Sequence, residues 1–274
     1  MMKKSRLILI RYLLALLPLL CAAPLLWYGT RVFVTDRFVI KGLSMEPTLH
    51  TGQGVWVNKL RMGPRLYTKF DFASPELHCI RLPGFRRLRV GDVAVFNYPY
   101  ARGGDSIAFR INLVYCKRCW GVPGDTVRIR DGEFSASLGS GHRYRAGAAE
   151  AAARLRSVPD SVLLARRSLK AGQFAGEGER WTVKDFGPIV VPKRGMTIRL
   201  DSLALRRYAR VIAWERKRQG AAEAPPLPAA GDAAVYTFRQ DWYFFVGDNL
   251  VDSRDSRYFG FVPADFVVGV IPGL

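Results

Sequence analysis

An uncharged and mostly apolar run from Tyr12 to Tyr28 constrains this chain more than any other feature of its sequence. A helix needs roughly 20 apolar residues to cross a bilayer, with about 17 as the lower limit. Arg11 extends the usable span, because its guanidinium can reach back to the interface. Trp27 and Tyr28 lie where interfacial aromatic residues are expected. The run therefore predicts a membrane anchor, and the rest of the chain must fold outside the bilayer.

The charges in front of this run predict its orientation. Four cations and no acid precede it: Lys3, Lys4, Arg6 and Arg11. Such a bias keeps the N-terminus in the cytoplasm. We therefore expect a single-pass protein of the inner (cytoplasmic) membrane, with everything after about residue 30 on the periplasmic side. A cleaved signal peptide is the alternative, but the run exceeds a usual h-region and small residues do not sit two apart at its end.

Charge and composition exclude several classes of protein. Hydrophobic residues make up 49% of the 274 residues, which excludes intrinsic disorder for most of the chain. Four cysteines are too few for a disulfide-stapled scaffold. A formal net charge of +19 favours an anionic partner. Beside an anchor, that partner is expected to be membrane lipid rather than nucleic acid.

Short segments with alternating apolar residues predict a mainly β fold built on antiparallel strands. The best examples are Gly54–Asn58, Val93–Phe96 and Thr126–Arg130, the last followed by the hairpin signal Asp131-Gly132. Two further strand regions are expected over Ile107–Trp120 and Tyr236–Val246, and an excursion loop is expected over Arg61–Arg89. Surface helices are expected at Ala148–Arg156 and Leu203–Lys217.

The same patterns predict the organisation of the chain. Residues 1–30 are expected to form the cytoplasmic N-terminus and the anchor. Residues 31–132 and 235–274 are expected to form one β core. Between them, residues 133–234 change in composition and end in an Ala-, Pro- and Gly-rich linker, so we expect an inserted subdomain there.

Two side chains outside the anchor suggest nucleophilic chemistry. Ser44 lies between Gly42 and Pro47, whose backbone restrictions suit a nucleophile held out from the chain, although an ordinary turn has the same composition. Lys117 lies in an otherwise apolar strand. If its side chain points inward, burial favours the neutral amine that a general base needs; if it points outward, it is an ordinary surface lysine.

A third segment, Gly247–Arg257, is unusually rich in hydrogen-bonding side chains. Its eleven residues include three acids, two arginines, two serines and an asparagine. A solvated turn rarely needs this capacity, so the composition indicates a functional segment.

Together these segments resemble the type I signal peptidases, membrane-bound Ser/Lys endopeptidases (leader peptidases) that remove signal peptides. The resemblance covers the anchor and four ordered boxes: Ser44–Leu49, Gly91–Val93, Lys117–Asp125 and Gly247–Arg257. A weaker similarity to the insert of Bacteroidetes-type enzymes covers Phe186–Pro188 and Pro192–Gly195. The resemblance implies an antiparallel β catalytic core of the signal-peptidase type, with secretory preproteins carrying small residues before the cleavage site as substrates.

The resemblance also implies roles for particular residues. Ser44 would be the nucleophile and Lys117 the general base, with Ser253 hydrogen-bonded to the Lys117 amine. Asp255 and Arg257 would brace the loop, and Arg118 would pair with Asp248. The Ser44 N–H would be one oxyanion donor. Gly42 offers no side-chain donor where some relatives have a hydroxyl. Residues expected to contact substrate are Ile40, Met45, Leu49, Tyr115 and Cys116.

Several alternatives stay open at this level. An inactive anchored binding protein would keep the fold without the chemistry, and a dedicated pilin- or conjugation-processing peptidase would narrow the substrate range. A thiol oxidoreductase would use Cys116 and Cys119, although residues three apart on a strand point to opposite faces. A zinc site would need Cys79 and His78 as well. We expect no cofactor and no metal.

Overall fold

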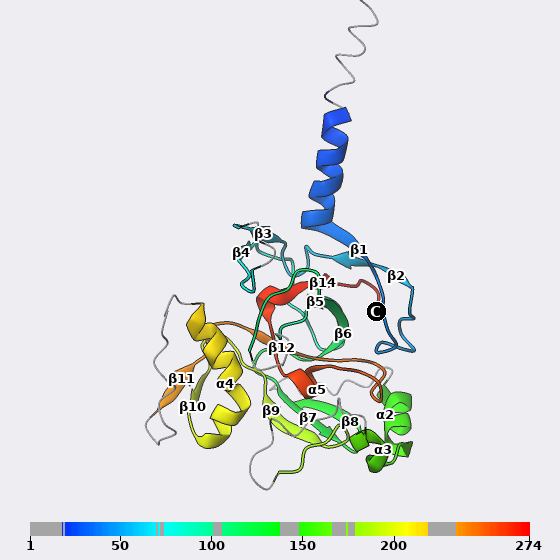
Figure 1. Cartoon of the computed structure of the whole chain (residues 1–274), viewed down its shortest axis with the longest axis vertical. Coiled ribbons are helices and arrows are strands. Elements are labelled where there is room, and N and C mark those ends of the chain that lie inside the picture. The colour runs from blue at the N-terminus through cyan, green and yellow to red at the C-terminus, as the bar shows by residue number, and fades with distance from the viewer. Residues whose placement is uncertain are drawn as a thin grey trace, which may run out of the picture.

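The computed structural model describes residues 18, 20–69, 71, 74–100, 106–137, 148–165, 174, 179–218 and 234–274. Within the expected anchor, residues 12–17 and 19 lie outside the described residues. Residues 20–29 are helical and continue into a π-helical turn, η1 (Thr30–Val34), which projects away from the folded part of the chain (Figure 1). Among the described helices, none combines the length and the hydropathy needed to cross a bilayer.

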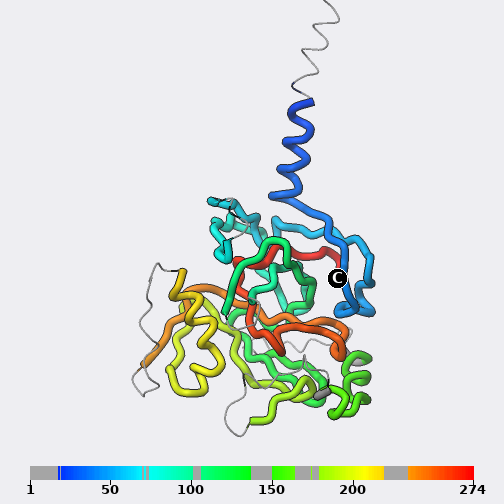
Figure 2. The backbone as a smooth tube through the Cα atoms, in the orientation of Figure 1, coloured from blue at the N-terminus to red at the C-terminus, as the bar shows by residue number. Residues whose placement is uncertain are grey.

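A seven-stranded sheet organises the fold, in the order β1-β2-β14-β5-β6-β12-β13. All of its pairs are antiparallel, and the tube view shows the sheet curling round its own interior (Figure 2). The strands are β1 (Thr35–Val39), β2 (Gly54–Asn58), β5 (Val93–Asn97), β6 (Val114–Gly121), β12 (Trp242–Val246), β13 (Val262–Pro263) and β14 (Val267–Val270).

Three smaller sheets and several helices surround this sheet. The smaller sheets are β3-β4 (Arg65–Tyr67, Cys79–Arg81), β8-β7-β9 (Glu133–Ser137, Thr126–Arg130, Phe186–Val190) and β10-β11 (Thr197–Arg199, Val235–Thr237). The helices are α2 (Ala148–Ser157), α3 (Asp160–Ala165), α4 (Ser202–Lys217), α5 (Ser256–Phe259) and the 3-10 turn η3 (Ala264–Phe266). The sheet of β7, β8 and β9 joins residues on both sides of position 133.

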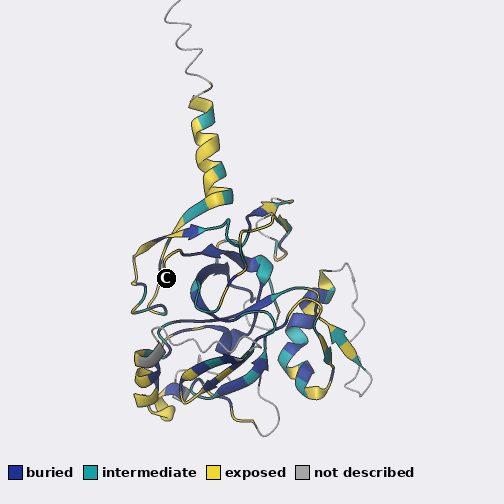
Figure 3. Ribbon diagram, turned by 180° about the vertical axis from the view of Figure 1, so that it is seen from behind, coloured by how far each residue is buried: buried dark blue, intermediate teal, exposed yellow. Residues whose placement is uncertain are grey.

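Burial follows the alternation of the strands. β2 shows it most clearly, because Val55 and Val57 are buried while Trp56 between them is 55% exposed. Buried residues line the inside of the sheets and the exposed ones lie outside and along the projecting helix (Figure 3). A small apolar cluster that includes Ile40, Met45 and Leu49 lies beneath the segment after β1, so this segment is anchored on both sides of Ser44.

The mainly β prediction is confirmed, and β2, β5 and β7 lie where the alternation indicates. The excursion loop expected over Arg61–Arg89 is wrong in one respect, because it contains the hairpin strands β3 and β4. These strands have only three residues each, too few for period two to be recognised among the surrounding Pro, Gly and Arg residues.

Candidate active site

Ser44 lies in a turn five residues after β1, held by its neighbours through the backbone. Gly42 has a φ of +83°, a left-handed conformation that favours glycine. The Glu46 N–H donates to the Leu43 carbonyl at 3.1 Å, and the Asn249 N–H donates to the Ser44 carbonyl at 3.1 Å. The turn is therefore hydrogen-bonded to the loop after β12. This contact fixes the direction of the Ser44 side chain.

Lys117 lies on β6 opposite Ala94 of β5, with only 4% of its surface exposed. Its Nζ donates hydrogen bonds to Ser44 Oγ and, at 3.0 Å, to the Cys116 carbonyl. Burial lowers the pKa of Lys117, and the nearby Asp255 carboxylate only partly opposes this effect. The structure thus joins an inward-pointing lysine to a turn serine 73 positions earlier.

Arg118, the next residue along β6, forms the ion pair with Asp248 that the resemblance implied. Its guanidinium contacts both carboxylate oxygens, at 2.8 and 2.5 Å, and donates to the Gly91 carbonyl at 2.9 Å. Thr48 Oγ1 donates to the same carboxylate at 2.5 Å. Sequence reasoning missed this role of Thr48, although it stands inside the Ser44 box. The arrangement ties the Ser44 turn, β6 and the loop after β12 together.

Asp255 and Arg257 form a second, fully buried pair. The guanidinium donates to the two carboxylate oxygens at 2.9 and 2.8 Å. Asp255 also accepts from the Gly247 N–H at 3.1 Å. Burial alone would lower the pKa of Arg257, but the Asp255 carboxylate outweighs it and raises that pKa. The pair fixes the loop between β12 and α5, as the resemblance implied.

Ser253 does not make the hydrogen bond expected with Lys117. Its Oγ is buried and has no hydrogen-bond partner among the described residues. It packs instead against Gly247, where a Cβ atom would stand 2.2 Å from Ser253 Oγ and 2.4 Å from the Ser44 carbonyl oxygen. The Lys117 amine contacts Ser44 Oγ and the Cys116 carbonyl instead, so a role for Ser253 in orienting it stays a prediction that this structure does not support by a hydrogen bond.

A cavity of about 620 Å³ opens beside Ser44 and Lys117. Of the residues expected to contact substrate, four line it: Ile40, Met45, Tyr115 and Cys116. Leu49 does not line it and is buried in the small apolar cluster instead. Sequence reasoning missed the charged residues Arg37, Lys41 and Arg254, which also line the cavity.

Two strand edges beside this cavity have no partner strand among the described residues. β1 is the last strand of its sheet, and β12 pairs with β6 only from Arg118 to Gly121, which leaves residues 114–117 free on that edge. Residues from both edges line the cavity. An extended peptide that enters there therefore meets unsatisfied backbone donors and acceptors on two sides.

The cysteines of β6 lie on opposite faces, as the period of a strand requires. Cys116 packs against the small cluster and lines the cavity, whereas Cys119 belongs to the main core. The cysteines at positions 21, 79, 116 and 119 are all free, and burial raises the pKa of Cys116 to about 12. Within the described ranges, no group of three His, Cys, Asp or Glu residues is placed to hold a metal ion.

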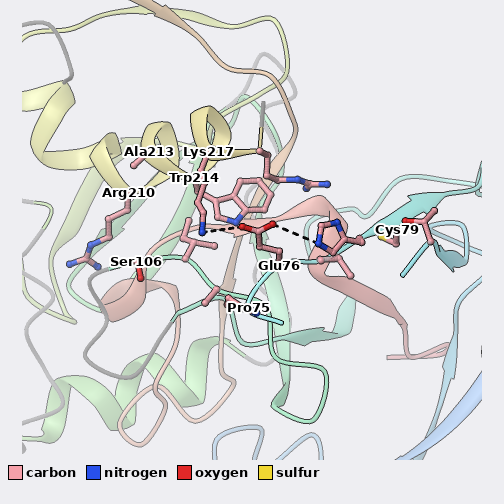
Figure 4. A pocket seen from close by; sticks show the side chains of 14 residues that line it. Pro75, Glu76, Cys79, Ser106, Arg210, Ala213, Trp214 and Lys217 are labelled. Atoms are coloured by element: carbon pink, nitrogen blue, oxygen red, sulfur yellow. Dashed lines mark ion pairs between the residues drawn. The ribbon is translucent and has the colours of Figure 1, made fainter. Parts of the chain in front are cut away.

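A second cavity, of about 680 Å³, lies between α4 and the segment around β4 (Figure 4). Glu76 is the one acid among its lining residues and contacts Lys217 at 3.1 Å and His78 at 3.7 Å, while Arg210 and Arg218 also line it. Neither Ser44 nor Lys117 lines it. Of these two cavities, Ser44 and Lys117 line only the one beside β1 and β6.

This chain is similar in sequence to known signal peptidases. The profile of the family described as "Signal peptidase, peptidase S26" matches residues 9–272. A signal peptidase I from Pseudomonas aeruginosa is 36% identical over 244 residues, covering 88% of this chain and 62% of the relative. A signal peptidase I from Buchnera aphidicola is 23% identical over 248 residues, covering 87% and 67%. The chain therefore spans less than two thirds of the length of the first of these relatives. A crystal structure of a signal peptidase I from Enterococcus faecalis superposes with a TM-score of 0.30 at 22% identity, over 68% of this chain and 97% of that one.

Proposed function

This chain belongs to the signal peptidase family, peptidase S26, and from that premise we propose that it is a serine endopeptidase that cleaves signal peptides from exported preproteins. The observation that carries the proposal is the hydrogen bond between Lys117 Nζ and Ser44 Oγ inside a buried setting. An inactive binding protein would have no use for this pair.

The chemistry follows from the neutral form of the buried amine. Lys117 Nζ accepts the Ser44 Oγ proton as that oxygen attacks the scissile carbonyl carbon. Lys117 then passes the proton to the departing amine, which leaves an ester between Ser44 and the signal peptide. In the second half, Lys117 takes a proton from water, the water oxygen attacks the ester, and the proton returns to Ser44 Oγ.

A backbone donor beside Ser44 supplies oxyanion stabilisation in this proposal. The Ser44 N–H donates to no other group in the part of the chain that the structure describes, so it is free to bind the negative oxygen of the tetrahedral intermediate. Gly42 adds no side-chain donor, and its positive φ makes a serine there a strained substitution.

The cavity supports a substrate bound as an added strand. The free edges of β1 and β6 supply backbone hydrogen bonds, and alternate substrate side chains point into the cavity. Ile40, Met45 and Cys116 line the cavity together with Ser44, and the proposal includes small substrate residues at the first and third positions before the cleaved bond.

The thiol chemistry considered above has less support. Cys116 and Cys119 point to opposite faces of β6, and the raised pKa of Cys116 keeps its thiol protonated and unreactive. Membrane attachment through residues 1–30, with the catalytic part on the periplasmic side, belongs to the same proposal and is supported by the sequence of that segment.

A peptidase assay tests the proposal directly. The detergent-solubilised full chain is incubated with an internally quenched peptide that contains one Ala-Gln-Ala sequence, with Ser44→Ala as the control protein. We expect one cut after the second alanine, identified by mass spectrometry, and none with the control. Absence of cleavage by the wild-type chain, or equal cleavage by both proteins, contradicts the proposal.

A further inference from the structure

Every charged residue that lines the cavity beside Ser44 is a cation. These residues are Arg37, Lys41 and Arg254; Lys117 also lines the cavity, as the neutral base of the proposed function, and no Asp or Glu does. Two other cavities among the described residues differ, because Glu76 lines the one next to α4, and Glu46, Glu150 and Asp248 line one beside α2. Asp248 and Asp255, the acids nearest to Lys117, are each bound to their own arginine.

Lys41 stands on one wall of the cavity with its side chain in solvent. Along Arg37–Lys41 the odd-numbered residues are exposed, whereas Phe38 and Ile40 are more buried. Lys41 therefore continues the outer side of β1 toward Ser44, three positions later. Among the described residues, no acid lies within ion-pair distance of it. Arg37 is less available to a substrate, because its guanidinium lies against Gly54 of β2.

Arg254 stands on the wall formed by the loop after β12. It is exposed, and its guanidinium lies 5.4 Å from the centre of the Tyr98 ring. A cation over an aromatic face keeps its full charge. No salt bridge to Arg254 is found in the described part of the chain. The cavity thus has a positive side chain on each wall that is not neutralised by a protein carboxylate.

We propose that these cations select substrates with acidic residues in the segment before the cleaved bond. This inference rests on the proposed function. When the first and third residues before that bond point into the cavity, the second and fourth point outward, beside Lys41 and Arg254. Opposite charges on neighbouring strands attract, and each such pair changes binding by about two- to five-fold. A lysine at either position is repelled by the same cations.

Three matched peptides test the inference. They share one Ala-x-Ala core and differ only at the second and fourth residues before the cleaved bond, which are both Gln, both Glu or both Lys. For the wild-type full chain we expect kcat/KM to be about five-fold higher for the Glu peptide than for the Gln peptide, and lowest for the Lys peptide. Raising the salt concentration is expected to narrow these ratios, because it screens exposed charges.

Two variant proteins test whether Lys41 and Arg254 cause the preference for the Glu peptide. In the double variant Lys41→Gln, Arg254→Gln, the ratio of kcat/KM between the Glu and Gln peptides is expected to fall toward one. Arg199→Gln removes an exposed arginine on β10, away from the cavity, and is expected to keep the wild-type ratio. Because the readout is a ratio within one protein, partial loss of active enzyme does not change it.

The outcomes separate this inference from the proposed function. If the Gln peptide is not cleaved at all, the proposed function is wrong. If it is cleaved and the wild-type ratio is one, or the ratio persists in the double variant, the charge selection is wrong. If the ratio is one and the double variant instead loses binding to phosphatidylglycerol vesicles, the cations bind lipid headgroups and the inference is overturned.

Discussion

At the scale of single residues, the proposed chemistry requires the Lys117 amine to be neutral. A carboxylate bonded to Lys117 would favour its charged form and raise its pKa. The two nearest acids avoid this, because Asp248 is held by Arg118 and Asp255 by Arg257. Each arginine neutralises its aspartate, so neither aspartate requires Lys117 as its positive partner. The buried amine is therefore left with the Ser44 hydroxyl and one backbone carbonyl as partners.

Substitutions at Ser44 and Lys117 test whether Lys117 acts as a general base or only as a positive charge. We expect Ser44→Ala, Lys117→Ala and Lys117→Arg each to lower kcat by about 10³-fold or more, as removal of a nucleophile or base does in a serine protease. Lys117→Arg keeps the positive charge, but a guanidinium gives up no proton near neutral pH. The measurement is peptide cleavage, with circular dichroism to verify the fold. Near-wild-type activity in any of the three variants would remove that residue from the proposed dyad.

The pH profile follows from the lowered pKa of Lys117. The base works only when neutral, so kcat/KM rises with pH through the pKa of the free enzyme. Burial places this limb below the ordinary lysine value of 10.5. An initial-rate series from pH 5 to pH 10.5 measures it, with a Ser44→Ala blank at every pH. A profile that stays flat down to pH 5 would exclude Lys117 as the base.

At the scale of elements, the local sequence predicted where strands lie along the chain. It did not predict which strands pair with one another in the sheet. β2 and β7 have the bounds that alternation indicates, and α4 begins one residue before the expected helix. Pairing is a different matter, because β14 lies between β2 and β5, which are both distant in sequence. No local sequence pattern predicts that strand order. The pairing of Ser44 with Lys117 was predicted only from the family resemblance carried by the four ordered boxes.

The side chains that sequence reasoning misplaced depend on such distant contacts. Thr48 meets Asp248 across 200 positions, and Arg254 lines the cavity only because its loop returns to β6. Ser253 lies in the expected segment, yet its Oγ is buried next to Gly247 and has no hydrogen-bond partner among the described residues. The composition therefore predicted which segments contribute to the site. The directions of the side chains within those segments could be known only from the folded structure.

Gly247 makes this dependence testable. It lies directly after β12, and a Cβ there would meet the Ser44 carbonyl oxygen at 2.4 Å. Because that oxygen belongs to the backbone, the Ser44 turn must shift to make room. We expect Gly247→Ala to lower kcat by about 10²-fold, the effect of a displacement of roughly 1 Å at a catalytic group. Gly29→Ala is the control, since nothing lies within 4 Å of its Cβ. Equal kcat in both variants would show that the turn tolerates the contact.

At the scale of the whole molecule, the position of the site relative to the projecting helix links the fold to its substrate. β1 follows η1 directly, and Ser44 comes ten residues after Val34. Ten extended residues span at most about 35 Å, so the site lies near the base of this helix. A peptide that begins in a bilayer next to the helix can therefore reach the cavity, as cleavage of a signal peptide requires.

The projecting helix is expected to hold the full chain in the membrane. Leu20, Leu25, Leu26 and Trp27 are 60–73% exposed on it, which water would not favour but lipid would. We expect the chain to stay with membranes after an alkaline carbonate wash, and the part after residue 30 to be digested when protease is added to spheroplasts. A charge in the middle of the run costs about 2.5–3.5 kcal/mol of insertion, so Leu20→Lys is expected to release part of the protein. Val162→Lys places the same charge on the exposed surface of α3 and is expected to release none. Release of the wild-type chain by carbonate, or equal behaviour of the two variants, would mean that residues 12–28 do not anchor this protein.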